Sequence, residues 1–474
     1  MPVTRNTSDI LLVAVNARYS HCAFAPRSLI ANLGPLAPRA GLLECDLEIT
    51  PLQLAERIAA RSPRVVGFSV YLWNVRLIEA TARLLRVVDS GMRLAAGGPE
   101  LTADYPHADL FDTVIVGEGE SAFRAFCETV LTDGGDFPLS SVLINQTGEA
   151  LASLALPYDR YTDTDLAQRT VYVETSRGCP FSCAYCTSAG TGLRLIPLLR
   201  LLPAFDELWR RGLRRFKFLD RSFNAPTEHA CAVLDFFRSR VTEDTCLHVE
   251  IQPDRLHPDV LSRLAAFPAG TLHLEVGIQT LTPHVAARIG RSPDTARTLE
   301  TLRVLTRETG ATVHADLIFG LPGEDEVAFA RGFNTLVTVC DPPEVQVNWL
   351  KVLPGTRFAR EAQRIGLAFN PEPPYELLRS DAMDFATLSR IQRFARCWEL
   401  VHNRGHFSEA CLRLHALAGG DFYACYQALA DHLCAAEGKL FAISRPRLAA
   451  LLDDFLARPL PRPDHPSPES PLSS

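Results

Sequence analysis

Three cysteines in one short stretch carry the most specific chemical signal in this sequence. Cys179, Cys183 and Cys186 have the spacing C-x3-C-x2-C. Thiolates this close together in a loop suit one metal centre, and cysteine thiolates are the usual ligands of iron–sulfur clusters. A 4Fe–4S cube normally takes four ligands, so three cysteines leave one iron free to bind another molecule.

Two alternatives to an iron–sulfur cluster stay open. A structural zinc site needs a fourth ligand at short spacing, and none follows; His21 and His229 are remote in the sequence. Buried cysteines can also gather by chance. The strand-like run before Cys179 and the aromatic Tyr185 before the last cysteine favour the cluster.

The segment R-G-C-P-F-x-C-x-Y-C resembles the cluster loop of the radical S-adenosylmethionine (SAM) superfamily. This resemblance implies that the open iron binds the amino and carboxylate groups of SAM. One electron passed to the sulfonium would then give methionine and a 5′-deoxyadenosyl radical. A reducing partner such as flavodoxin or ferredoxin is implied as well.

Composition limits the remaining possibilities. The chain has 474 residues, enough for about three domains, and 47% of them are hydrophobic. A net charge of −7 without a dense basic run argues against a large nucleic-acid-binding surface. We expect no signal peptide and no membrane segment, since no run approaches the ~20 apolar residues that a membrane span needs. The 13 cysteines show no disulfide framework, so a reducing cytoplasm is expected.

Residues 1–134 alternate apolar β-rich runs with helical patterns. We expect helices at 52–60 and 75–88, between strands at 10–15, 42–49, 65–71, 94–97 and 114–116. Strands separated by helices pair in parallel with right-handed crossovers, which predicts an α/β fold with a five-stranded doubly wound sheet. Ligands of such sheets bind at the carboxyl ends of the strands.

This first domain resembles the cobalamin-binding domain that precedes many radical SAM cores. The D-x-H-x-x-G loop, whose histidine binds cobalt from below, is missing; His21 lies in the corresponding loop without its Asp and Gly. Either cobalamin binds without a protein ligand on cobalt, which we favour, or the domain has lost its cofactor. The resemblance implies cobalamin contacts at Ser69, Tyr71, Gly97, Gly98, Gly117, Glu118 and Gly119.

Residues 135–169 are expected to form a connector that includes a small hairpin between 141 and 151. Residues 170–356 then repeat strand, loop and helix, which predicts a partial (β/α)6 barrel with its chemistry at the carboxyl ends of the strands. The expected strands are 171–175, 216–219, 247–251, 272–278, 313–319 and 345–350.

Polar strings follow these strands in the same order as in radical SAM cores. The resemblance implies that Asp220 and Arg221 lie near the methionine end of SAM, and that Glu250 and Gln252 hold its ribose or carboxylate. Each residue taken singly could instead belong to a rim turn or a helix cap, and Asp316 is open in the same way. The implied adenine contacts are Tyr185, Gly277, Gln279, Gly320, Leu321 and Pro322.

Helical patterning dominates 357–458. This part resembles an uncharacterised helical domain that often follows radical SAM cores of the cobalamin type. His402, His406 and His415 are interpreted as core or surface residues of its helices. Proline and serine dominate 459–474, for which disorder is expected.

These features predict a radical SAM enzyme that performs cobalamin-dependent methyl transfer, or another radical modification, on a small molecule. One alternative is a tRNA methylthiotransferase, which would need a basic RNA module and a second cluster. Cys22, Cys45 and Cys127 do not form a suitable set for that cluster. The other alternative is a non-catalytic metal-binding scaffold. The sequence identifies neither the substrate nor a catalytic side chain.

Overall fold

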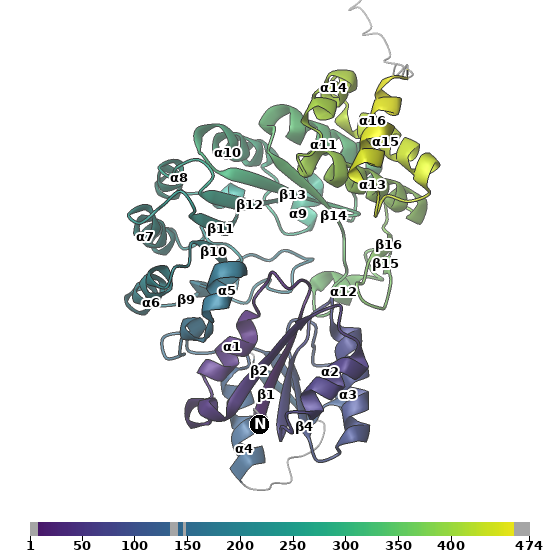
Figure 1. Ribbon diagram of the computed structural model, residues 1–474. Helices are drawn as coiled ribbons and strands as arrows, with labels where there is room; N and C mark the ends of the chain where they lie inside the picture. The colour runs from purple at the N-terminus through teal and green to yellow at the C-terminus, as the bar shows by residue number, and fades with distance from the viewer. Residues whose placement is uncertain (1–7, 133–140, 146–147, 459–474) are drawn as a thin grey trace, which may run out of the picture.

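The structure is a computed structural model that describes residues 8–132, 141–145 and 148–458. Two parallel sheets and a group of C-terminal helices make up these residues. In Figure 1 the first sheet lies at the bottom, the second sheet curves above it, and the C-terminal helices lie at the upper right. The predicted disordered tail, 459–474, lies outside the described residues.

The first sheet is parallel throughout, with the order β2-β1-β3-β4-β5-β6. Helices α1 (Phe24–Ala31) and α4 (Glu120–Thr132) cover one face, and α2 (Pro51–Ala59) and α3 (Val75–Val88) cover the other (Figure 1). Each face has its own apolar cluster. The doubly wound fold predicted from the sequence is therefore confirmed. The strands are β1 (Ile10–Asn16), β2 (Ala40–Asp46), β3 (Val65–Ser69), β4 (Arg93–Gly97), β5 (Thr113–Gly117) and β6 (Ser141–Asn145).

The sixth strand corrects the prediction of a hairpin in the connector. β6 pairs in parallel with β5 and extends the sheet. The side-chain amide of Asn145, at its end, donates to the carbonyl oxygen of Glu118 at 3.0 Å. A short apolar run has the same pattern in a hairpin and in an edge strand, so the sequence pattern alone could not separate the two.

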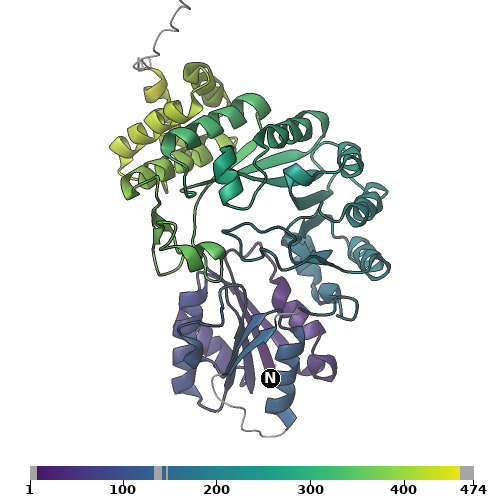
Figure 2. The same ribbon diagram turned by 180° about the vertical axis from the view of Figure 1, so that it is seen from behind.

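The second sheet is also parallel, with the order β14-β13-β12-β11-β10-β7. β7 and β14 are its edges, so the barrel is open, as predicted. The helices that follow the inner strands lie on the outer side of the curve (Figure 1 and Figure 2). The strands are β7 (Val171–Val173), β10 (Arg215–Phe218), β11 (Cys246–Ile251), β12 (Leu272–Gln279), β13 (Thr312–Phe319) and β14 (Glu344–Trp349), and the outer helices are α6 (Leu198–Arg210), α7 (Thr227–Arg238), α8 (Pro258–Ala265), α10 (Thr295–Glu308) and α11 (Glu326–Cys340).

Strict alternation gives the barrel strands two different faces. In β12, Leu272, Leu274 and Val276 are buried, whereas His273 and Glu275 between them are only partly covered. Burial of the apolar side against the outer helices fixes the register, because a shift by one residue would exchange the two faces. Polar side chains therefore line the concave face of the open barrel.

The C-terminal helices pack on α11 and on β14. Phe333 of α11 contacts Trp398 of α13, with ring centroids 4.9 Å apart. The barrel and these helices share one apolar cluster. In the part of the chain that the structure describes, no helix combines the length and apolar character needed to cross a membrane. The helices are α13 (Phe385–Trp398), a π-helical turn η5 (Glu399–Asn403), α14 (Ser408–Ala418), α15 (Phe422–Glu437) and α16 (Arg445–Leu456).

Candidate cluster and cofactor site

The three cysteines lie in a loop between two short antiparallel strands, β8 (Ser176–Arg177) and β9 (Arg194–Leu195). Gly178 opens the loop with φ of +85°, and a Cβ there would lie 1.8 Å from the carbonyl oxygen of Gly192. Only glycine fits this position. The backbone N–H of Cys179 donates to Oγ1 of Thr191 at 3.1 Å. The chain therefore shapes the loop through its own contacts.

This cluster loop lies over the carboxyl ends of the barrel strands. Sγ of Cys179 is 3.6 Å from Oγ of Ser222, which follows β10. Sγ of Cys183 is 4.0 Å from Nη1 of Arg291. The backbone N–H of Ala184 donates to the carbonyl oxygen of Ile289 at 2.9 Å, just after α9 (Pro283–Arg288).

The three thiols do not form a site for a single metal ion in the described part of the chain. Within 8–132, 141–145 and 148–458, no three side chains of His, Cys, Asp or Glu meet closely enough to hold one metal ion. In a 4Fe–4S cube each thiolate binds a different iron, so the sulfurs need not converge on one point. A tetrahedral zinc site, which needs four ligands around one ion, is not formed by the described residues.

Arg291 joins the cluster loop to two barrel strands, and no strand-end signal in the sequence pointed to it. Its guanidinium donates to Oε1 of Gln252 at 2.6 Å and to the carbonyl oxygen of Gly277. The preceding Gly290 has φ of +79°, and a Cβ there would lie 2.6 Å from the carbonyl oxygen of Ser182. A glycine at the end of α9 is the one hint that the sequence contains.

Several residues predicted to contact SAM lie at this mouth. The guanidinium of Arg221 is 3.8 Å from the carboxylate of Glu250. Burial raises the pKa of Glu250 to about 7, although the charge of Arg221 opposes the shift. Tyr185 is partly buried against the barrel core beside Cys183.

A β-bulge shapes the end of β12. The pairing with β13 shifts between Gly277 and Gln279, and Gln279 has φ of +70°. A Cβ at Gly277 would lie 2.5 Å from Nε2 of Gln279. The bulge therefore turns the Gln279 side chain back over the glycine, and bulges are frequent where a side chain is re-aimed next to a site.

Two of the predicted SAM contacts are used by the fold instead. Asp220 is 1% exposed and accepts hydrogen bonds from the backbone and hydroxyl of Thr175 at 2.9 and 2.6 Å and from Ser176 at 2.5 Å. A Cβ at Gly320 would lie 2.7 Å from Cδ2 of Leu377, so that turn is packed against the segment before α13. Asp220 anchors the entry to the cluster loop, and its carboxylate is not free to contact a ligand. Leu321 and Pro322, in the same turn, are buried, and any contact from this turn to SAM would have to come from its backbone.

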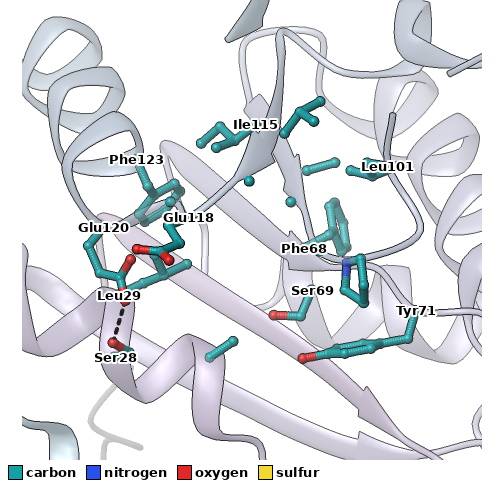
Figure 3. A pocket seen from close by; sticks show the side chains of 18 of the residues that line it. Ser28, Leu29, Phe68, Ser69, Tyr71, Leu101, Ile115, Glu118, Glu120 and Phe123 are labelled. Atoms are coloured by element: carbon teal, nitrogen blue, oxygen red, sulfur yellow. Dashed lines mark hydrogen bonds between the residues drawn. The ribbon is translucent and has the colours of Figure 1, made fainter. Parts of the chain in front are cut away.

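A cavity of about 510 Å³ lies between the carboxyl edge of the first sheet and the mouth of the barrel. Figure 3 shows Glu118 and Glu120 on one side of it and Ser69 and Tyr71 on the other. From the barrel side, Thr187, Ser188 and Arg221 line the same cavity. Every residue that the sequence predicted to contact cobalamin lines it: Ser69, Tyr71, Gly97, Gly98, Gly117, Glu118 and Gly119.

The glycines of this cavity have different roles. A Cβ at Gly98, where φ is +131°, would lie 2.2 Å from the carbonyl oxygen of Val70, so the backbone itself requires glycine. A Cβ at Gly97 would lie 3.6 Å from its nearest neighbour, the carbonyl oxygen of Ile115. The absence of a side chain at Gly97 therefore leaves the cavity floor open without being needed for folding.

Ion pairs tie the cavity to the cluster loop. Arg177, two residues before Cys179, pairs with Glu118 at 3.3 Å, Glu120 at 2.7 Å and Glu174 at 2.8 Å. Burial raises the pKa of Glu174 to about 7 even beside this guanidinium. Buried charges of this kind are stable only while paired, so Arg177 fixes the first sheet against the cluster loop.

His21 does not line the cavity. Its Nδ1 is 2.7 Å from the hydroxyl of Tyr172 on β7, and burial lowers its pKa. No His, Cys, Met or Lys is among the described residues that line the cavity. A cobalamin in this cavity would therefore have none of these side chains of the described lining as a ligand on cobalt.

Comparison with known proteins agrees with both halves of this site. The B12 binding domain family matches residues 40–127, and the Radical SAM superfamily matches residues 173–332. The chain thus carries a B12-binding domain followed by a radical SAM domain, the domain pair of the cobalamin-binding class of radical SAM proteins. The cofactors of this class are a 4Fe–4S cluster, SAM and cobalamin.

Two curated relatives are methyltransferases. The chain is 25% identical to 2-(S-pantetheinyl)-carbapenam-3-carboxylate methyltransferase of Streptantibioticus cattleyicolor over 62% of its own length and 47% of the relative. It is 21% identical to the cobalamin-dependent radical SAM methyltransferase TokK of Streptomyces tokunonensis, over 87% of this chain and 67% of the relative. The chain thus spans about half the length of the first relative and two thirds of the second.

Solved structures share the fold. The methyltransferase TsrM from Kitasatospora setae, with cobalamin and a [4Fe-4S] cluster bound, superimposes with a TM-score of 0.60 at 18% identity, over 81% of this chain and 84% of TsrM. The cobalamin-dependent SAM radical enzyme OxsB, with aqua-cobalamin and SAM bound, gives 0.60 at 11% identity, over 95% and 79% of the two chains. The predicted α/β architecture is confirmed.

Proposed function

We propose that this protein is an enzyme that uses a 4Fe–4S cluster, SAM and cobalamin to transfer a methyl group to a small molecule. The observation that supports this proposal is a cavity shared by the first sheet and the cluster loop, because the predicted cobalamin contacts, Arg221 and the residues after Cys186 all line it. A tRNA methylthiotransferase is disfavoured: Cys22 and Cys127 are buried in two different apolar clusters and do not form a second cluster site.

When bound, the reduced cluster supplies the electron that cleaves SAM, and cobalamin serves as the methyl carrier. The chain supplies position and shielding. Cys179, Cys183 and Cys186 would hold the cluster, and Arg291 holds the loop against two strand ends. Arg221 and Glu250 would contact SAM. The first sheet covers the barrel mouth, which keeps water from a reactive carbon radical.

Product analysis tests the proposal. The full chain would be reconstituted anaerobically with iron, sulfide and hydroxocobalamin, then given SAM and dithionite. Methyl transfer to an unactivated carbon consumes two molecules of SAM. One is cleaved reductively to 5′-deoxyadenosine, and the other loses its methyl group and gives S-adenosylhomocysteine. Formation of both, with the second dependent on hydroxocobalamin, supports methyl transfer. Formation of 5′-deoxyadenosine alone would point to another radical modification, and formation of neither would favour the scaffold. We also propose that a flavodoxin or a ferredoxin is the physiological reductant that takes the place of dithionite. The proposed location of the protein is the cytoplasm.

A further inference from the structure

A second cavity, of about 760 Å³, lies where the open edge of the barrel meets the C-terminal helices. Gln346, Asn348 and Trp349 on β14 line it. Arg393 on α13 and Lys439 after α15 line it as well. Figure 1 shows α13 beside the edge strand β14. No part of the radical SAM site described above reaches this cavity.

The lining of this edge cavity is positively charged. Lys351, Lys439, Arg393 and Arg396 line it, and the described residues of its wall include only two carboxylates, Glu376 and Glu399. The chain as a whole has a net charge of −7 and only three lysines, so a local excess of cations that includes two of them is unusual.

Some of these charges are already neutralised and others are free. The carboxylate of Glu399 accepts from Asn403 at 3.0 Å and lies 3.4 Å from Arg404. Among the described residues, Lys351 and Lys439 have no carboxylate within 4.0 Å. Lys439 lies over the ring of Phe441, 5.2 Å from its centroid. Two lysine ammonium groups are therefore available to an anion.

Aromatic side chains also border the cavity. Trp349 is one of the residues that line it. Phe441, 62% exposed, adds an aromatic surface at the rim.

Two residues of the cavity lie on the lumen side of the edge strand β14. Gln346 and Asn348 pair in register with Asp316 and Ile318 of β13, on the polar side of the sheet. Because β14 is an edge strand, no further strand separates these two amides from the C-terminal helices. A molecule whose reacting end lies in the lumen can therefore extend past β14 into the edge cavity.

We propose that the edge cavity binds an anionic group, a phosphate or a carboxylate, at the end of the substrate remote from the reacting carbon. This inference rests on the proposed function and deepens it, since it names a chemical feature of the substrate. It also gives the C-terminal helices a role in substrate selection. Lys351 and Lys439 are the residues that recognise the anion.

Binding of small fluorinated probes tests this without turnover. Titrations of reconstituted full-length enzyme with 4-fluorophenyl phosphate, 4-fluorobenzoate and 4-fluorobenzylamine would be followed by ¹⁹F line broadening. We expect at least one anion to bind about tenfold more tightly than the amine. The stronger of the two anions identifies phosphate or carboxylate as the group recognised.

Variants locate the binding. Lys351→Glu and Lys439→Glu should each weaken binding of the anion about tenfold. Lys351→Arg and Lys439→Arg keep the positive charge and should retain the binding. Arg331→Glu, the same change of charge at an exposed position of α11 outside the cavity, should have no effect. The inference would be overturned if the amine bound as tightly as the anions or if neither anion bound. It would also be overturned if Arg331→Glu weakened binding of the anion as much as the lysine variants do. SAM cleavage by the same preparation is measured separately, so a failure of the proposed function is recognised independently.

Discussion

The two sheets of this protein use the residues at their carboxyl edges differently. At the edge of the first sheet, the loops after β3, β4 and β5 all line one cavity. At the mouth of the barrel, Arg221 and Glu250 are available to a ligand. Asp220 and Gly320 there are occupied by contacts within the protein. The topology of a strand end therefore indicates where a site lies, but not which side chains remain free.

The difference has a physical cause. A short open sheet converges its loops on one crevice, and small residues there leave room for the ligand. The barrel mouth must also hold a long loop with three thiols in place, and this requires buried acceptors such as Asp220. Burial and hydrogen-bond partners distinguish a side chain that supports the fold from one that is free to contact a ligand. Residue type alone predicts neither burial nor hydrogen-bond partners.

Loss of a cluster cysteine should have the largest effect. Cys183→Ala leaves too few thiolates to hold the cube, so we expect bound iron to fall to the background level and 5′-deoxyadenosine to be undetectable. Iron analysis and chromatography measure both. Cys231→Ala, at a buried position of α7 away from the loop, is the control and should keep both. Normal iron content in Cys183→Ala would contradict the assignment.

The second-largest effect should follow from removal of the Arg177 guanidinium, which lies between the first sheet and the cluster loop. Arg177→Gln leaves the buried carboxylates of Glu120 and Glu174 unpaired, which should lower the free energy of unfolding by about 3–5 kcal/mol. Urea denaturation measures the change. Arg210→Gln, which breaks an exposed pair with Asp206, should leave the free energy of unfolding nearly unchanged. Equal losses in the two variants would show that Arg177 does not couple the sheets.

The paired glycines of the first sheet separate folding from binding. Gly98→Ala should destabilise the protein by about 1–3 kcal/mol, because its Cβ would meet the carbonyl oxygen of Val70. Gly97→Ala should keep the melting temperature and reduce the cobalamin that copurifies. Differential scanning fluorimetry and corrinoid absorption measure the two properties. Unchanged cobalamin content in Gly97→Ala would show that the corrin ring does not bind against Gly97 in this cavity.

The smallest effect should be at Glu250 and should depend on pH. Burial raises the pKa of its folded-state carboxyl to about 7, so the folded protein binds more protons than the unfolded chain between about pH 4.5 and 7. Stability from this group is therefore lost as the pH rises through that window. Without SAM, Glu250→Gln should be about 1–2 kcal/mol more stable than the parent at pH 8 and nearly equal at pH 4.5, by urea titration.

Asp220→Asn provides the contrast to Glu250→Gln. It weakens a fully buried acceptor of three hydrogen bonds and should reduce stability at pH 8, opposite in sign to Glu250→Gln. If both variants changed stability in the same direction at pH 8, the division of the barrel mouth into fold and ligand residues would be wrong.

Periodicity and motif spacing predicted most of this fold and the location of the site. Apolar runs identified the strands of both sheets, and the cysteine spacing identified the cluster loop. Local patterns could not reveal that 141–145 joins the first sheet, because a short apolar run looks the same in a hairpin and in an edge strand. Arg291 was missed because its role depends on a tertiary contact between the residues after α9 and Cys183. The edge cavity was missed because it forms only when β14 meets the C-terminal helices.

Electron paramagnetic resonance of the reconstituted protein, with cobalt as Co(II), tests most directly whether the cluster and cobalamin bind on opposite sides of one cavity. We predict that reduction of the cluster broadens the cobalt signal through magnetic interaction. Cys183→Ala should abolish the broadening while cobalamin remains bound. A cobalt signal that is unchanged by reduction of a fully assembled cluster would contradict this arrangement.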